Sequence, residues 1–197
     1  MSVPSDKLVL FCGPSGSGKT TIVHHLLGKF PELTFSVSAT TREKRANEVN
    51  GKDYHFLTLD EFKRKMHQQQ FLEWEEVYKE RYYGTLKSEV KRILDEQKVV
   101  LFDVDVEGGL SIRKHYPKQI LDVFVMPPTV DDLHKRLITR ASESEDSLAK
   151  RLAKAETELA YAYRFNNVLV NNKLEIALKE AEVIVDQFLY GAIPDEI

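Results

Sequence analysis

Hydrophobic and polar residues follow two different spacings along this chain, and together they predict alternating strands and helices. Short apolar runs predict strands over residues 7–12, 34–38, 98–103, 120–126 and 168–170. Helical spacing predicts helices over residues 20–27, 86–96, 107–115, 129–140 and 173–190, and a long helix that ends near residue 165. Thr129 and Asp132 are spaced to cap the helix that runs to Arg140. The alternation predicts an α/β fold, a parallel sheet with helices on both faces.

The segment after the second predicted strand has a different character. Residues 39–53 carry four basic side chains without apolar periodicity, and we interpret them as a basic loop. Residues 54–57, 71–78 and 82–84 have the length of short strands. A helix over residues 59–69 begins with Thr58 and Glu61 at capping-box spacing. We therefore predict a small mixed α/β flap, with antiparallel strands, inserted into the core.

One motif near the N-terminus carries specific chemistry. Residues 13–20 read Gly-Pro-Ser-Gly-Ser-Gly-Lys-Thr and match the pattern G-x-x-x-x-G-K-[ST] at every fixed position. An apolar strand precedes the motif and a helix follows it, which disfavours the alternative of a glycine-rich turn with a chance Lys-Thr. Gly13, Gly16 and Gly18 can adopt positive φ, so that backbone N–H groups point at an anion beside a helix N-terminus. The motif predicts that Lys19 binds the phosphates of a nucleoside triphosphate and that Thr20 binds its Mg²⁺.

Composition narrows the class of protein. The chain has 197 residues, enough for one α/β domain, with 42% hydrophobic and 30% charged residues and a net charge of −3. This balance favours small-molecule partners over nucleic acid or a membrane surface. The first residues lack a signal-peptide pattern, and Cys12, the single cysteine, ends an apolar strand as a buried core residue. We expect a protein of the reducing cytoplasm.

Three further clusters of polar and charged residues indicate which reaction the bound phosphates undergo. Asp103 ends an apolar strand at the sheet edge where a carboxylate can hold Mg²⁺; the alternative is a solvated strand-end acid. Arg42 and Arg45, with Tyr54 and Tyr83, are suited to grip a second phosphate, although Arg42 to Arg45 also fits a solvated charged turn.

The third cluster consists of Arg136, Arg140 and Arg151, which flank the polar stretch 141–147. Two helices that carry arginines around a polar hinge are typical of a lid that closes over transferring phosphates. The alternative is surface pairing of Arg136 and Arg140 with Asp132 and Glu143.

Together these motifs resemble the guanylate kinase family, the ATP:GMP phosphotransferases of the nucleoside monophosphate kinase group. The similarity covers nearly the whole chain, with its motifs in the family's order. It rests on residues 13–20, 36–42, 48–54, 71–74, 82–84, 103–105, 127–128 and 136–151.

The resemblance implies a single domain with a core (about 1–36, 88–128 and 156–197), a GMP-binding flap (about 37–87) and a lid (about 129–155). It implies transfer of the γ-phosphoryl group of MgATP to GMP, and to dGMP, in purine nucleotide metabolism and GMP recycling, by a monomer or homodimer. The implied ATP-binding residues are Gly13, Pro14, Ser15, Gly16, Ser17, Gly18, Lys19, Thr20, Thr21 and Asn171. The implied GMP-binding residues are Ser38, Arg42, Arg45, Tyr54, Glu73, Tyr83, Thr85 and Asp105. The implied catalytic cations are Lys19, Arg42, Arg136, Arg140 and Arg151, and Thr20 and Asp103 are the implied metal-binding residues.

The chain departs from the family's pattern at several positions. Thr85 stands where serine is common and keeps a hydroxyl, whereas Glu107 replaces the usual glutamine and adds a charge. Lys44 and Ala141 stand where proline and glycine are frequent, which bears on loop rigidity and lid kinetics. Asn172 replaces an aspartate on the adenosine side.

The choice of purine is assigned to Glu73. Its carboxylate can accept hydrogen bonds from the ring N–H and the exocyclic amine of guanine, whereas adenine presents a lone pair at that ring nitrogen. Two acceptors facing each other in a dry pocket discriminate by roughly 10⁴ or more. Two alternatives stay open here: a non-catalytic guanylate-kinase-like module that binds proteins, and a P-loop kinase with another acceptor, such as AMP or a phosphorylated sugar.

Overall fold

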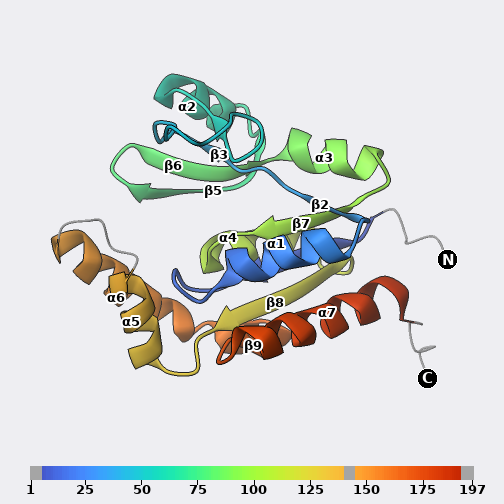
Figure 1. Ribbon diagram of the computed structural model, residues 1–197. Helices are drawn as coiled ribbons and strands as arrows, with labels where there is room; N and C mark the ends of the chain where they lie inside the picture. Colours follow the sequence, from blue (N-terminus) through green and yellow to red (C-terminus); the bar gives the residue numbers. More distant parts are fainter. Residues whose placement is uncertain (1–5, 140–144, 192–197) are drawn as a thin grey trace.

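The core of the protein is a five-stranded parallel sheet. A computed structural model describes residues 6–139 and 145–191 (Figure 1). The strand order is β2 (Leu33–Phe35), β7 (Val99–Asp103), β1 (Leu8–Cys12), β8 (Ile120–Met126) and β9 (Asn167–Val170), and every pair of neighbours is parallel. Strands β2 and β7, which come next in the chain among the strands of this sheet, lie on one side of β1. Strands β8 and β9 lie on the other side. A crevice therefore opens at the carboxyl ends of the central strands.

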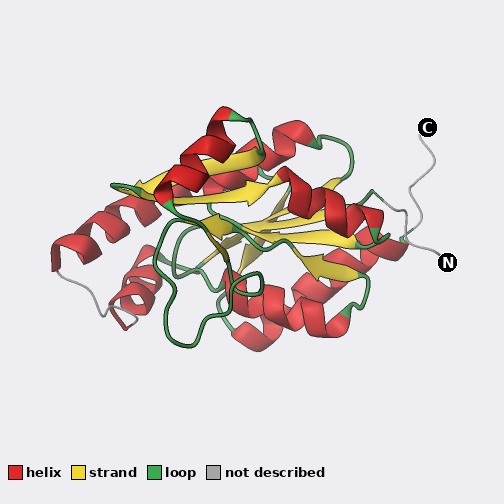
Figure 2. Cartoon of the chain, turned by 90° about the horizontal axis from the view of Figure 1, so that it is seen from above, coloured by secondary structure: helices red, strands yellow, loops and turns green. Residues whose placement is uncertain are grey.

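Each face of this sheet buries its own hydrophobic layer, because side chains alternate along a strand. Val9 and Phe11 pack against α1 (Lys19–Lys29) and α7 (Leu174–Tyr190). Leu8, Leu10 and Cys12 pack on the opposite face with α3 (Lys87–Asp95) and α4 (Val106–His115). Figure 2, seen from above, shows helices on both faces of the sheet. The predicted α/β fold is confirmed.

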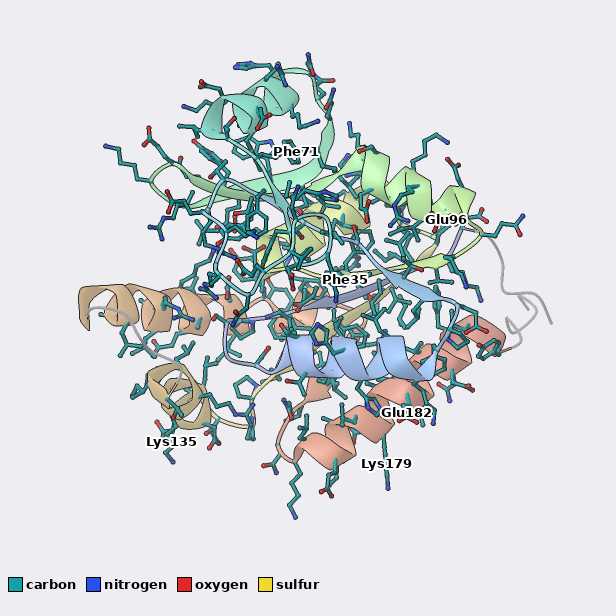
Figure 3. All side chains as sticks on the ribbon, turned by 45° about the horizontal axis from the view of Figure 1, so that its top comes forward. Phe35, Phe71, Glu96, Lys135, Lys179 and Glu182 are labelled. Atoms are coloured by element: carbon teal, nitrogen blue, oxygen red, sulfur yellow. The ribbon has the colours of Figure 1, made fainter. Side chains whose placement is uncertain are left out.

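A second, four-stranded sheet stands apart from the first. Its order is β4 (His55–Phe56), β3 (Ala39–Thr40), β6 (Arg81–Leu86) and β5 (Phe71–Tyr78). Helix α2 (Leu59–His67) covers it through Phe62, whose ring stacks on Phe71 with centroids 4.3 Å apart. Figure 3 shows Phe71 at the base of this flap.

Two further helices form the third part of the molecule. Helix α5 (Val130–Thr139) packs against α6 (Glu145–Leu159) through Leu133, Leu137 and Ala155. Figure 1 shows both helices at the end of the main sheet that is remote from the two termini. Thr129 begins α5 as predicted, because its hydroxyl accepts a hydrogen bond from the Asp132 N–H.

Three local predictions were wrong. Strand β3 lies inside the segment that was interpreted wholly as a basic loop. It pairs with β4 in parallel, not antiparallel, since residues 41–54 are long enough to make a crossover. The helix predicted to end near residue 165 ends at Leu159, because the chain tightens into a 3₁₀ turn (Ala162–Arg164). That turn buries Phe165 against Phe124 and leads the chain into β9.

The capping box at the start of α2 is complete and gives a test of the fold. The Thr58 hydroxyl accepts from the Glu61 N–H, and the Glu61 carboxylate accepts from the Thr58 N–H. We expect Thr58→Ala to lower the free energy of unfolding in urea by about 1 kcal/mol, because a helix donor loses its partner. Thr157→Ala is the control: its hydroxyl bonds only the Ala153 carbonyl in its own helix. An equal loss in both variants would contradict the role of the cap.

Candidate active site

The glycine-rich turn between β1 and α1 has the backbone that the motif predicts. Gly13, Gly16 and Gly18 have φ values of 138°, 87° and 97°. A Cβ atom at Gly13 would lie 2.2 Å from the Val125 carbonyl oxygen, and one at Gly18 would lie 2.2 Å from Asn171 Nδ2. Glycine is therefore required at both positions for the backbone to approach its neighbours this closely.

Residues distant in sequence hold this loop in place. Asn171 is buried at the end of β9, and its Nδ2 donates to the Ser17 carbonyl at 2.8 Å. Arg136 of α5 donates from Nη2 to the Asn171 carbonyl at 2.8 Å and lies 3.4 Å from the Ser17 carbonyl through Nη1. The contact expected between Asn171 and ATP stays a prediction, whereas its contact with the loop is direct.

The functional groups of the loop converge on a small concavity of about 130 Å³. Its lining consists of Ser15, Gly16, Gly18, Lys19, Thr20, Thr21 and Asp103. Lys19 Nζ donates to the carbonyls of Gly13 at 2.7 Å and Pro14 at 3.0 Å. The Thr20 hydroxyl donates to Asp103 Oδ2 at 2.6 Å. The structure thus places the predicted strand-end acid against the predicted Mg²⁺ hydroxyl.

A cleft of about 780 Å³ joins this loop to the flap and the lid. Its lining includes eleven residues that sequence reasoning had selected: Gly13, Ser15, Lys19, Thr20, Ser38, Tyr54, Glu73, Tyr83, Asp103, Asp105 and Arg151. A nucleotide phosphate at the loop and a second ligand under the flap would share one space.

At the flap end of the cleft, two carboxylates are oriented by hydrogen bonds. The Thr85 hydroxyl, which is buried, donates to Glu73 Oε1 at 2.6 Å. Asp105 begins α4, and its Oδ1 accepts from the Gly108 N–H at 2.8 Å. Burial raises the pKa of Glu73 to about 7, although the Thr85 hydroxyl opposes this effect. This end of the site is built from hydrogen-bond acceptors.

Sequence reasoning missed Glu75, Lys154 and Glu158, which also line the cleft. Lys154 of α6 lies 2.6 Å from Glu75 Oε1 and 3.4 Å from Asp105 Oδ2. Burial, reinforced by the hydrogen-bonded neighbour Asp105, raises the pKa of Glu75 to about 7, although Lys154 opposes this effect. Strand periodicity was a usable signal for Glu75, since residues 73 and 75 of one strand share a face. Lys154 had a weaker signal, its position one helical turn after Arg151.

The four residues of the predicted phosphate grip all belong to the flap: Arg42 and Arg45 lie in the basic loop, Tyr54 directly follows it and Tyr83 lies on β6. Both Nη atoms of Arg42 bind the Glu48 carboxylate, at 2.9 and 2.7 Å, and this contact lowers the pKa of Glu48 to about 2. The Arg42 guanidinium also lies 5.3 Å from the centre of the Tyr54 ring, and Tyr54 contacts Tyr83 edge to face. Arg45 is exposed, with its N–H bonded to Glu48. Glu48 was in the motif, but its role as partner of Arg42 was missed.

The lid brings one arginine to the phosphate loop from each of its helices. Besides Arg136, Arg151 of α6 lies 3.1 Å from Ser15 Oγ through Nη2. Arg136 donates to the Asn171 and Ser17 carbonyls and not to Asp132, the surface alternative, whose carboxylate accepts from the Thr129 hydroxyl. Arg140, Glu143 and Ala141 lie outside the described residues.

The chemistry of Thr20 and Asp103 fits a magnesium ion that arrives with a nucleotide. Mg²⁺ in nucleotide sites takes one or two protein oxygen ligands and fills its other positions with phosphate oxygens and water. Over residues 6–139 and 145–191, no cluster of three or more His, Cys, Asp or Glu is arranged to hold a metal by itself.

Across the part of the chain that the structure describes, no helix has the length and apolar character to cross a membrane.

Known proteins resemble this chain over nearly its whole length. A family profile described as "Guanylate kinase" matches residues 5–188. A guanylate kinase from Bacteroides fragilis is 45% identical over 183 residues, which is 93% of this chain and 90% of that protein. One from Porphyromonas gingivalis is 44% identical over 184 residues, 93% and 98% of the two chains. The crystal structure of guanylate kinase from Anaplasma phagocytophilum superimposes with a TM-score of 0.75 at 23% identity, covering 98% of this chain and 89% of that one.

The raised pKa of Glu73 predicts a pH-dependent cost of folding. A carboxyl whose pKa rises from its ordinary value to about 7 on folding favours the folded state below the ordinary value, and this advantage is lost as pH rises through 7. Glu73→Gln abolishes this titration. We expect its unfolding free energy relative to wild type to increase by about 1–3 kcal/mol from pH 5 to pH 8, as urea titrations would measure. Glu76→Gln, exposed on the same strand, is the control; a constant difference for Glu73→Gln would contradict burial of this carboxyl.

Proposed function

The chain belongs to the guanylate kinase family, and we propose that it transfers the γ-phosphoryl group of MgATP to GMP, giving ADP and GDP. One observation carries this reaction. A single cleft has the Lys19 phosphate loop at one end and the oriented carboxylates Glu73 and Asp105 at the other. Two nucleotides bound there, with their phosphates between these ends, would meet in line.

The donor end binds the ATP phosphates through residues 13–21 and Asn171. The positive φ of three glycines leaves backbone N–H groups free of side-chain obstruction at the start of α1, where the helix dipole favours an anion. Lys19 exchanges its bonds to the Gly13 and Pro14 carbonyls for the β- and γ-phosphates. Asn171 and Arg136 keep the loop in shape while this exchange occurs.

The metal ion of MgATP is held by Thr20 and Asp103. These side chains already share a hydrogen bond, and their oxygens are the ligands that Mg²⁺ prefers. When bound, the ion would neutralise part of the negative charge that develops during transfer.

The acceptor phosphate is gripped by Arg42, Arg45, Tyr54 and Tyr83. Glu48 supports Arg42 from one side and Tyr54 contacts it from another, so the guanidinium is oriented before GMP arrives. A charge-assisted, forked contact suits a phosphate monoester. Arg45 is exposed here and would fold inward onto the bound phosphate.

The guanine base is read by Ser38, Glu73, Thr85 and Asp105. Thr85 fixes one oxygen of Glu73, which orients the carboxylate plane toward the cleft. The ionised carboxylate accepts from the two adjacent donors of guanine, whereas adenine offers an acceptor at the ring position. Only the carboxylate form of Glu73 fits this role, so GMP binding displaces the proton that burial favours.

Transfer itself requires no general base in this arrangement. The second pKa of a phosphate monoester is near 6, so the acceptor oxygen is already an anionic nucleophile at neutral pH. The protein's task is to align two polyanions and neutralise them, which Lys19, Arg42, Arg136, Arg140 and Arg151 accomplish. Closure of the lid and the flap excludes water and suppresses hydrolysis of ATP.

Several finer assignments belong to the same proposal. The core comprises about residues 1–36, 88–128 and 156–197, the flap about 37–87 and the lid about 129–155. The enzyme serves GMP recycling in the cytoplasm, also accepts dGMP, and acts as a monomer or homodimer. The free and buried Cys12 supports the reducing compartment.

The two rival functions are less well supported. A protein-binding module of this fold has no need for a phosphate loop with φ-positive glycines, Lys19, and Thr20 bonded to Asp103. A kinase for AMP would need a donor toward the adenine ring nitrogen, whereas Glu73, oriented by the Thr85 hydroxyl, places an acceptor on the cleft.

Removal of the phosphate-binding cation tests the donor site. We expect Lys19→Met to lower kcat for GDP formation by about 10²–10³ or more, because a preorganised charge at the transferring phosphates is lost. The circular dichroism spectrum should be unchanged. Lys29→Met, in the last turn of the same helix, is the control for loss of a lysine. Full turnover in the Lys19 variant would refute the proposed role of the loop.

A comparison of phosphate acceptors tests both the proposed reaction and the role of Glu73 in selecting the base. ADP release with GMP, IMP and AMP, measured in a coupled assay, should show strong preference for GMP in the wild type. Glu73→Gln should lower kcat/KM for GMP by about 10²-fold or more while ATP affinity changes little, because the amide places a donor where an acceptor is needed. Equal use of AMP by the wild type would exclude the proposed function, and an unchanged preference in the variant would exclude the role of Glu73.

A further inference from the structure

A single lysine connects the three parts of the molecule. Lys154 extends from the lid helix α6 to Glu75 of the flap strand β5 at 2.6 Å. The same ammonium lies 3.4 Å from Asp105, which follows the core strand β7, and 3.8 Å from Glu158 of its own helix. Lys154 and its three partners all line the cleft.

The partners of Lys154 are more buried than Lys154 itself. The exposed fractions of the side chains are 41% for Lys154 but 25% for Glu75, 30% for Asp105 and 9% for Glu158. Burial raises the pKa of Glu158 to about 7, as it does for Glu75, so these acids resist ionisation unless a cation is near. Lys154 is such a cation. Its own pKa is raised, because its contacts with Glu75 and Asp105 outweigh the burial that opposes its charge.

The same helix also reaches the donor side of the cleft. Arg151 precedes Lys154 by three residues, so the two side chains share a face of α6. Arg151 lies 3.1 Å from Ser15 of the phosphate loop, whereas Lys154 lies against the carboxylates at the acceptor end. Any movement of α6 as a rigid unit therefore changes both contacts together.

We propose that Lys154 is a positioning residue that couples the two nucleotide sites: its ion pairs with Glu75 and Asp105 hold α6 over the cleft, so that a guanine nucleotide at the acceptor site strengthens nucleotide binding at the phosphate loop. The coupling rests on the proposed function. A bound guanine donates hydrogen bonds to the carboxylates at the acceptor end and so holds the flap and the core together around Lys154. Lys154 then keeps α6 over the cleft through its contacts with Glu75 and Asp105, and the lid presents Arg151 to the donor phosphates. By linkage, the donor nucleotide strengthens acceptor binding by the same factor.

The ion pairs of Lys154 differ from ordinary surface ion pairs, which contribute little to stability or to binding. Surface pairs are weak because both partners stay in water. Lys154 faces three carboxyl groups that the cleft partly desolvates, and a bound nucleotide would displace more water from them. The effect on coupling should therefore be moderate and measurable, while the effect on the fold should be small.

The test measures the affinity for a non-hydrolysable ATP analogue with Mg²⁺, by calorimetry, in the absence and presence of saturating GMP. In the wild type GMP should tighten binding of the analogue, and the ratio of the two Kd values is the coupling factor. Lys154→Met should reduce this factor about fivefold, within the usual range of such couplings. Its Kd for the analogue alone should change less than twofold, and its KM for GMP should rise more than its kcat falls.

Two further variants separate an ionic link from general damage. Lys154→Glu combined with Glu75→Lys restores one lid-to-flap ion pair and should recover a larger coupling factor than Lys154→Glu alone. Glu75→Gln should reduce the coupling factor from the flap side, in case Lys154→Met fails to fold. Lys135→Met is the matched control, since Lys135 lies on the outer side of lid helix α5 (Figure 3) and should leave the factor unchanged.

The outcomes distinguish the two proposals. A wild type that does not bind GMP would overturn the proposed function and this coupling with it. A wild type that binds GMP and shows no coupling, or the same coupling in Lys154→Met and Glu75→Gln, would overturn the role of Lys154 alone. Equal losses in Lys135→Met would assign the effect to the charge of the lid in general and would also overturn it.

Discussion

The parallel pairing of β1 with β7 is the contact on which the whole site depends. It places Phe11 beside Asp103, so that the phosphate loop after β1 and the acids after β7 leave the sheet at the same edge. Pairing of β1 with β8 then brings Val125 so close to Gly13 that no side chain fits between them. A shift of one residue in the register of β1 would move the side chains of that strand to the wrong faces and would separate Thr20 from Asp103. Hydrophobic packing on both faces of the sheet therefore fixes the chemistry at its edge.

Local sequence patterns predicted the structural features that depend on neighbouring residues in the chain. The phosphate loop depends on glycines within eight positions, the cap of α2 on Thr58 and Glu61, and the core strands on short apolar runs. The missed features depend on distant partners. Lys154 and Glu75 are 79 residues apart in the chain, and nothing near either residue indicates the other. The parallel pairing of β3 with β4 likewise depends on the path of a long loop, which spacing does not specify.

The cleft is an arrangement of opposite charges that differs between its two ends. Backbone N–H groups, Lys19 and the lid arginines surround the donor end, where anions must be held. At the acceptor end Lys154 contacts Glu75, Asp105 and Glu158, and Glu73 lines the same cleft. Burial raises the pKa of Glu73, Glu75 and Glu158 to about 7. Burial of these acids costs free energy unless hydrogen-bond donors reach them. Under the proposed function, the ring N–H and the exocyclic amine of guanine are such donors.

Thr85 shows how a departure from the family's pattern can keep the chemistry and change its rigidity. Serine and threonine both supply the hydroxyl that donates to Glu73 Oε1 at 2.6 Å. Threonine is branched at Cβ, which restricts rotation about χ1. At this buried position in β6 its methyl group is shielded from solvent. The hydroxyl is therefore held toward Glu73 in fewer conformations than a serine hydroxyl would have. Under the proposed function the Glu73 carboxylate faces two adjacent donors on a flat base, and a fixed neighbour then favours binding, because less orientational freedom is lost when the base binds.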